Sequence, residues 1–155
     1  SEEGRGSIFK FTIPYQRITI ETDMNDMENN EIKENVSVGR TILVAEDVES
    51  NFLLLKAIIG KIYTLLHAWN GREAVEMYEQ SQPDLILMDI KMPEMDGLEA
   101  TRIIRKVSQE IPIIALTAFA FDDDRVKALE AGCNDYLTKP LSAPLLKETI
   151  VKYLI

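Results

Sequence analysis

Short apolar runs recur along residues 40–155 and alternate with longer segments in which apolar residues return every three or four positions. Runs that are apolar throughout are typical of strands buried on both faces, and the periodic segments are typical of amphipathic helices. The runs predict five strands, at residues 40–45, 61–68, 85–89, 111–117 and 136–138. The periodic segments predict five helices, at residues 48–59, 72–80, 98–107, 122–131 and 144–154. This alternation predicts an α/β domain whose parallel sheet is covered by helices on both faces.

Two of these helices carry more detailed expectations. An acid run begins at Asp122, and we interpret Asp122 as a helix N-cap, because anions favour the positive end of the helix dipole, in preference to a metal ligand. Gly132 then marks the end of the same helix. The helix at residues 98–107 should turn its apolar side chains toward the core, namely Leu98, Ile103, Ile104 and Val107.

Polar side chains stand at the carboxyl ends of four predicted strands. They are Glu46 and Asp47 after the first strand, Asp89, Thr117, and Lys139 after the last. Open α/β folds build their sites where the carboxyl ends of parallel strands meet. We therefore expect two acids, a third acid, a hydroxyl and an amine along one rim of the sheet.

These residues, in this order, resemble the receiver (response-regulator) domain of two-component signalling, and the resemblance covers residues 40–155. It implies a flavodoxin-like (βα)5 doubly wound parallel sheet with strand order 2-1-3-4-5. It further implies that Asp89 accepts a phosphoryl group and that Asp47 and Asp89 bind Mg²⁺ (or Mn²⁺) directly. Glu46 would assist through a water molecule, and the backbone carbonyl of Lys91 would complete the protein ligands. A carboxylate that attacks phosphorus needs such cations to offset charge repulsion.

The resemblance also assigns the remaining rim residues. Lys139 would pair with Asp89 and then with the phosphoryl oxygens, and Thr117 would hydrogen-bond one of those oxygens. Thr117 and Tyr136 would form a switch, in which Tyr136 fills the space that Thr117 leaves as the loop at residues 118–121 moves inward. The alternative for Tyr136 is a fixed, half-buried aromatic. In the family the Lys-Pro bond, here Lys139–Pro140, is commonly cis.

Composition narrows the possible partners. The 155 residues suffice for one domain with a proper core, and the net charge of −9 argues against a nucleic-acid-binding surface. No signal-peptide pattern or long apolar run is present, so we expect a cytoplasmic fragment without membrane contact, cut from a parent that can be anchored in the inner membrane. Cys133 is the only cysteine and is expected to pack in the core. His67 is the only histidine, and it lies on a strand, so the phosphodonor histidine should be elsewhere.

The residues before the α/β region suggest a second context. Residues 1–20 contain a Gly-x-Gly-Ser-x-Phe-x-Phe stretch from Gly4 to Phe11, which resembles the tail of the ATP-binding domain of sensor histidine kinases. The other interpretation is a Gly-rich turn that leads into an ordinary strand. Residues 21–39 form an acidic linker, with six acids and one lysine between positions 21 and 34. This order is that of a hybrid histidine kinase, and a start at Ser1 suggests an excised fragment without the boxes needed to hold ATP.

Three functions compete for this chain. The first is a phosphoacceptor receiver that exchanges phosphoryl groups with a kinase core in its parent chain or with a histidine phosphotransfer protein. This fragment would then only phosphorylate itself at Asp89, and its oligomeric state is open. The second is a receiver-like module that binds partners without phosphorylation. The third is an aspartyl-phosphate phosphatase, but such enzymes carry an Asp-x-Asp motif at the nucleophile, whereas this chain has Asp89-Ile90-Lys91. A flavodoxin is a still weaker interpretation, because the first loop lacks a phosphate cradle.

Overall fold

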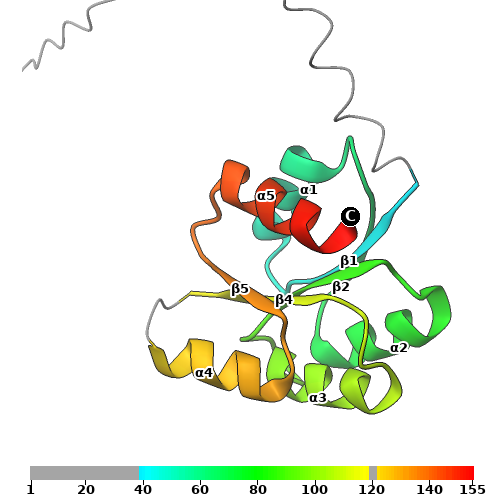
Figure 1. The fold of residues 1–155 in the computed structure, drawn as a ribbon, viewed down its shortest axis with the longest axis vertical. Helices are drawn as coiled ribbons and strands as arrows, with labels where there is room; N and C mark the ends of the chain where they lie inside the picture. The colour runs from blue at the N-terminus through cyan, green and yellow to red at the C-terminus, as the bar shows by residue number, and fades with distance from the viewer. Residues whose placement is uncertain (1–38, 119–121) are drawn as a thin grey trace, which may run out of the picture. The chain divides into compact units, whose positions relative to one another are not determined.

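The computed structural model describes residues 39–118 and 122–155, and residues 1–20 and 21–38 of the predicted kinase tail and linker lie outside them (Figure 1). Five strands are present: β1 (Thr41–Ala45), β2 (Thr64–Ala68), β3 (Leu85–Asp89), β4 (Ile113–Thr117) and β5 (Asp135–Thr138). They alternate with five helices: α1 (Glu49–Ile59), α2 (Gly71–Ser81), α3 (Gly97–Val107), α4 (Asp122–Ala131) and α5 (Ala143–Leu154). The predicted alternation of strands and helices is confirmed.

The strands form one parallel sheet in the order β2-β1-β3-β4-β5, as predicted. In register, Ala45 lies opposite Met88, Asp89 opposite Leu116, and Thr117 opposite Thr138. The strands therefore end at nearly the same level. The residues that follow them meet at one edge of the sheet.

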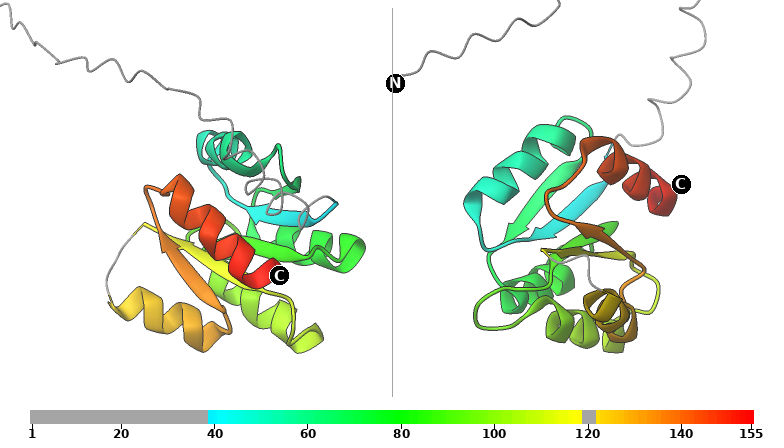
Figure 2. Two further views of the ribbon diagram at one scale, coloured as in Figure 1. Left: turned by 45° about the horizontal axis from the view of Figure 1, so that its top comes forward. Right: turned by 90° about the vertical axis from the view of Figure 1, so that its left-hand side faces the viewer.

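Helices cover both faces of this sheet, with α1 and α5 on one face and α2, α3 and α4 on the other (Figures 1 and 2). β1, β3 and β4 lie between the two layers, and β3 and β4 are buried along their whole length. Successive side chains of a strand point to opposite faces, so these strands supply two apolar clusters, one to each layer of helices. Continuous apolar sequence is what such doubly covered strands require.

Several element boundaries differ from the prediction. β2 begins at Thr64 rather than residue 61, because the amides of Ile62 and Tyr63 both donate to the carbonyl of Ile59, at 3.0 Å, and continue the turn after α1. β4 begins at Ile113, after Pro112, which has no amide hydrogen for the ladder. α4 begins at Asp122, and the side chain of Asp122 lies outside the described residues, so its role as an N-cap stays a prediction.

The core prediction for α3 holds in part. Ile104 is fully buried, Leu98 packs against the core while partly exposed, and Ile103 is half-buried. Cys133, outside α3, is buried in the core as expected. The prediction that Val107 lies in the core is wrong. Val107 is 65% exposed, because it is the last residue of α3 and lines an open hollow beside Pro83 and Pro112. Among the described residues, no helix has the length and apolar character needed to cross a bilayer.

Gly97 packs directly under the end of β3. A Cβ atom at Gly97 would lie 2.0 Å from the carbonyl oxygen of Asp89, and the Gly97 amide donates to the Ile90 carbonyl at 3.0 Å. We expect Gly97→Ala to lower the free energy of unfolding by about 2 kcal/mol or more, because backbone atoms must separate. Urea unfolding measures this change.

Gly39→Ala is the control for that substitution. Its φ of 100° penalises a side chain, but no atom lies within 4 Å of the added Cβ, so only about 1 kcal/mol should be lost. Equal losses at Gly97 and Gly39 would contradict the close approach of α3 to β3.

Candidate functional site

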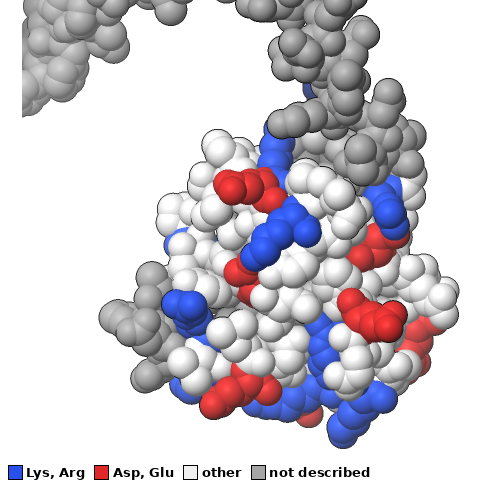
Figure 3. Space-filling model, in the orientation of Figure 1, with Lys and Arg blue, Asp and Glu red and all other residues white. Residues whose placement is uncertain are grey.

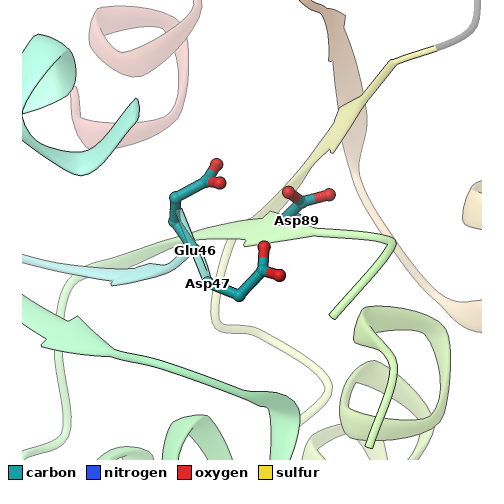
Figure 4. Close-up of side chains that lie close together, drawn as sticks. All are labelled: Glu46, Asp47 and Asp89. Carbon is teal, nitrogen blue, oxygen red and sulfur yellow. The ribbon is translucent and has the colours of Figure 1, made fainter. Parts of the chain in front are cut away.

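Three carboxylates gather at the carboxyl edge of the sheet, from Glu46 and Asp47 after β1 and from Asp89 at the end of β3 (Figure 4). One oxygen of each lies within 4.8 Å of the others. Glu46 and Asp89 are buried and Asp47 is half-buried. In Figure 4 the carboxylates of Glu46 and Asp47 come from the end of β1, and the carboxylate of Asp89 lies to one side of them, at the end of β3.

Lys139 joins two of these acids. Its ammonium nitrogen lies 2.5 Å from Oδ2 of Asp89 and 2.6 Å from Oε2 of Glu46. Burial lowers the pKa of Lys139, but its hydrogen bonds to Asp89 and Glu46 outweigh burial and leave the pKa raised. Lys139 is therefore a fixed positive charge beside Asp89 at neutral pH.

Asp89 is held on both oxygens. Oδ2 accepts from Lys139, and Oδ1 accepts from the backbone amide of Lys91 at 3.0 Å. Burial raises the pKa of the Asp89 carboxyl, and the negative charge of Glu46 adds to this, while Lys139 and the Lys91 amide act in the opposite direction; the net shift is upward. The carboxylate is thus costly to keep ionised without a further cation.

Glu46 is completely buried and both of its carboxylate oxygens have protein partners. Oε1 accepts from the side-chain amide of Asn51 at 2.9 Å and from the backbone amide of Val48 at 3.3 Å. Oε2 accepts from Lys139. Lys139 was expected beside Asp89, but its second partner, Glu46, was not predicted, and neither was the contact from Asn51. The only sign of Asn51 in the sequence was its place as a polar residue in the first turn of the helix that follows the acidic pair.

The remaining predicted residues lie along the same edge. Thr117 is buried at the end of β4, and its carbonyl accepts from the amide of Lys139 at 2.7 Å. Tyr136 is half-buried on β5, with the Arg125 guanidinium carbon 5.3 Å from its ring centre. The Lys139–Pro140 bond is cis, as the resemblance implied. Residues 119–121 lie outside the described residues, so the movement expected of their loop stays a prediction.

The acidic group fits a hard divalent cation. Mg²⁺ prefers oxygen ligands, keeps several waters and needs only one or two carboxylates from the protein. Glu46 and Asp89 have protein partners, whereas within the described part of the chain the Asp47 carboxylate forms no hydrogen bond or ion pair. The oxygens of Asp47 therefore have their full capacity to bind a cation.

One face of the molecule carries charges of both signs. On the face shown in Figure 3, basic and acidic side chains are interspersed with uncharged ones.

The chain belongs to the response regulator receiver domain family, whose model matches residues 42–151. It is 39% identical to the polar-differentiation response regulator DivK of Brucella anthropi over 118 residues, which cover 74% of this chain and 96% of that protein. Its fold is similar to the receiver domain of sensor histidine kinase PA1611 of Pseudomonas aeruginosa, solved with a magnesium ion in the active-site cleft (TM-score 0.71, 38% identity, 75% of this chain and 98% of that one). It is also similar to the receiver domain of the response regulator Ssk1 of Saccharomyces cerevisiae, crystallised with the histidine phosphotransfer protein Ypd1 (TM-score 0.71, 33% identity, 74% and 88%). The predicted family and fold are confirmed.

The raised pKa of Asp89 predicts how stability depends on pH without metal. From the ordinary value of 3.8 up to the raised value, the folded protein binds more protons than the unfolded chain. Stability therefore falls as pH rises through this window, and the loss persists above it. We expect Asp89→Asn to remove this fall, so that the variant gains stability over wild type as pH rises.

Urea unfolding in EDTA across this pH range measures the difference between the two proteins. The raised pKa of Lys139 affects stability in a different pH range. The stabilisation that Lys139 provides is complete below pH 10.5 and is lost only as the pH rises through the higher pKa of the folded protein. Parallel pH profiles for wild type and Asp89→Asn would contradict the upward shift at Asp89.

Proposed function

We propose that this chain accepts a phosphoryl group on Asp89 from a phosphohistidine. An oxygen of Asp89 attacks phosphorus, the new O–P bond forms as the N–P bond of the donor breaks, and the donor imidazole keeps the electron pair and takes up a proton. The observation that carries this proposal is the Lys139 ammonium, 2.5 Å from the buried Asp89 carboxylate and aligned to offset charge during transfer. Such transfers depend on positioning and on charge stabilisation.

Mg²⁺, or Mn²⁺, is the proposed cofactor. Asp47, Asp89 and the Lys91 carbonyl would hold it, and Glu46 would act through a water molecule. A bound cation would supply charge stabilisation to the phosphoryl oxygens. The carboxylate set and the free capacity of Asp47 support this assignment.

Asp47→Asn tests the metal assignment. The variant keeps the size of the side chain but removes the charge of Asp47, which among the three carboxylates of the site has no protein partner in the described residues, so we expect Mg²⁺ affinity to fall by at least about tenfold. Titration calorimetry measures the affinity. Glu49→Gln, an exposed acid in the first turn of α1, is the control and should bind Mg²⁺ as wild type does. Equal affinities for wild type and Asp47→Asn would remove Asp47 from the site.

Thr117 and Tyr136 are the proposed switch. The hydroxyl of Thr117 would bond a phosphoryl oxygen and draw the following loop toward the site. Tyr136, half-buried on the next strand, would then turn inward. A phosphoryl group brings the charge and acceptor oxygens that such a movement needs.

The proposed context is the receiver of a hybrid sensor histidine kinase, with a kinase core in the parent chain or a histidine phosphotransfer protein as partner. The stretch from Gly4 to Phe11 supports the kinase origin, and a sensor kinase receiver is among the similar structures. The similar yeast receiver was crystallised with a phosphotransfer protein, which supports that kind of partner. The DivK relatives are response regulators and give no support to the kinase context. A cytoplasmic location belongs to the same proposal.

The test is exposure of the protein to a small acyl phosphate, with intact mass as the readout. We expect one phosphoryl group per chain, present with Mg²⁺, absent in EDTA and labile to hydroxylamine. Borohydride should convert the modified residue to homoserine, and peptide mass should place it at Asp89. No adduct from this donor or from a phosphorylated phosphotransfer protein, with no Mg²⁺ binding, would favour the partner-binding module.

A further inference from the structure

Glu46 is the most constrained of the acids at the site. Its amide donates to the Ala68 carbonyl at 3.0 Å, and its carbonyl accepts from Nε2 of His67 at 2.9 Å. Its carboxylate is completely buried and reaches Lys139 with one oxygen and α1 with the other. Backbone and side chain are thus fixed separately.

The start of α1 supplies the contact to the second oxygen. Asn51 donates its side-chain amide to Oε1 of Glu46 at 2.9 Å, whereas the Val48 amide donates only at 3.3 Å. The next residue, Phe52, stacks on His67 with ring centres 3.8 Å apart and planes within 2°. Two neighbouring residues of α1 therefore hold Glu46. Asn51 binds its carboxylate directly, and Phe52 packs against His67, which binds its backbone carbonyl.

This contact reaches the reacting carboxylate in three steps. Asn51 fixes Oε1 of Glu46, Oε2 of Glu46 binds the Lys139 ammonium, and the same ammonium binds Oδ2 of Asp89. Lysine has a flexible four-carbon stem, so a second fixed anion restricts where its charge lies. A neutral amide suits the position at Asn51, because it satisfies a buried oxygen without adding a charge that would compete for Glu46.

We propose that Asn51 is a positioning residue for phosphoryl transfer: it holds Glu46 so that Glu46 keeps the Lys139 ammonium beside Asp89. This inference rests on the proposed function of Asp89. Asn51 itself touches neither the acceptor nor the metal ligands Asp47 and Asp89 in any described contact. Because Glu46 would reach the cation only through a water molecule, we expect a larger effect on the rate of transfer than on the affinity for Mg²⁺.

The first test needs no metal and no phosphate. In EDTA, the Lys139 ammonium should give a proton–nitrogen NMR signal, because two ion pairs and a side chain only 20% exposed slow its exchange with water. Lys139→Arg assigns the signal by its loss. We expect Asn51→Leu, which is close in size and has no donor, to shift or broaden this signal, and Asn51→Gln, which keeps the amide, to retain it. Ser50→Ala, the neighbouring exposed position, is the matched control and should leave the signal unchanged.

The second test separates transfer from metal binding. With the acyl phosphate at saturating Mg²⁺, Asn51→Leu should accept the phosphoryl group about tenfold more slowly, while its Mg²⁺ dissociation constant stays within about twofold of wild type. Asn51→Ala should behave in the same way, which guards against an effect of the added apolar surface. Wild type, Asn51→Leu and Asn51→Ala are all compared at a temperature at which each of them is folded.

The outcomes are distinct. A wild-type Lys139 signal in both Asn51→Leu and Asn51→Ala, or a wild-type rate in both, would overturn the proposal. A slower rate caused only by weaker Mg²⁺ binding would also overturn it. If wild type accepts no phosphoryl group, the proposed function of Asp89 fails, and the Lys139 signal still decides whether Asn51 positions Lys139.

Discussion

Asp89→Asn is expected to abolish phosphoryl uptake. Asparagine has nearly the same shape as aspartate, but its neutral amide cannot attack phosphorus. Removal of a nucleophile typically lowers a rate by at least about 10³-fold, and here no stable adduct should form at all. Intact mass after incubation with the acyl phosphate and Mg²⁺ measures the loss.

Asp96→Asn is the matched control, because it makes the same change in the loop that follows β3. Asp96 caps α3 by accepting from the Glu99 amide at 2.8 Å, and asparagine caps a helix equally well. The control should accept one phosphoryl group at the wild-type rate. An adduct on Asp89→Asn equal to that of wild type would show that another residue is the acceptor.

The order of strands and helices was predictable because the apolar runs that form the strands can be recognised in the sequence itself. β3 and β4 are apolar up to their last residues, Asp89 and Thr117, and such runs are typical of strands buried on both faces. Boundaries were less predictable where a local turn competed with the ladder, as at Ile62 and Tyr63 after α1. Val107 was assigned to the core from helical spacing, but spacing does not show where a helix extends past the sheet.

The site was predictable to the extent that strand ends determine position. Asp89 and Lys139 were expected together, because parallel strands end at one edge, and the structure brings them into contact. The pairing of Lys139 with Glu46 joins residues 93 positions apart and depends on which of two neighbouring acids turns toward it. The contact from Asn51 to Glu46 depends on that same choice, so neither could be found from spacing.

Lys139→Met is expected to slow phosphoryl uptake at saturating Mg²⁺ by about 10²- to 10³-fold, the usual effect of removing one preorganised group that stabilises developing charge. Methionine keeps the length of the stem and removes the ammonium that contacts Asp89. Lys139→Arg should recover little of the lost rate of uptake, because a planar guanidinium cannot occupy the point between two carboxylates that the ammonium occupies. Uptake is followed by the appearance of the phosphoryl adduct with time.

Lys152→Met is the control for this loss of charge. Lys152 pairs with Asp135 at 2.9 Å but is 62% exposed and lies away from the rim, so uptake should be unchanged. Lys139→Met should also lose stability at neutral pH, because Glu46 and Asp89 are left buried without their cation, and recover part of it in acid, where the Asp89 carboxyl, whose pKa is already raised by burial, takes up a proton. A wild-type rate in Lys139→Met with normal Mg²⁺ binding would mean that the metal alone offsets the charge in transfer. The ion pair with Asp89 would then serve only to hold the buried carboxylate in the resting protein.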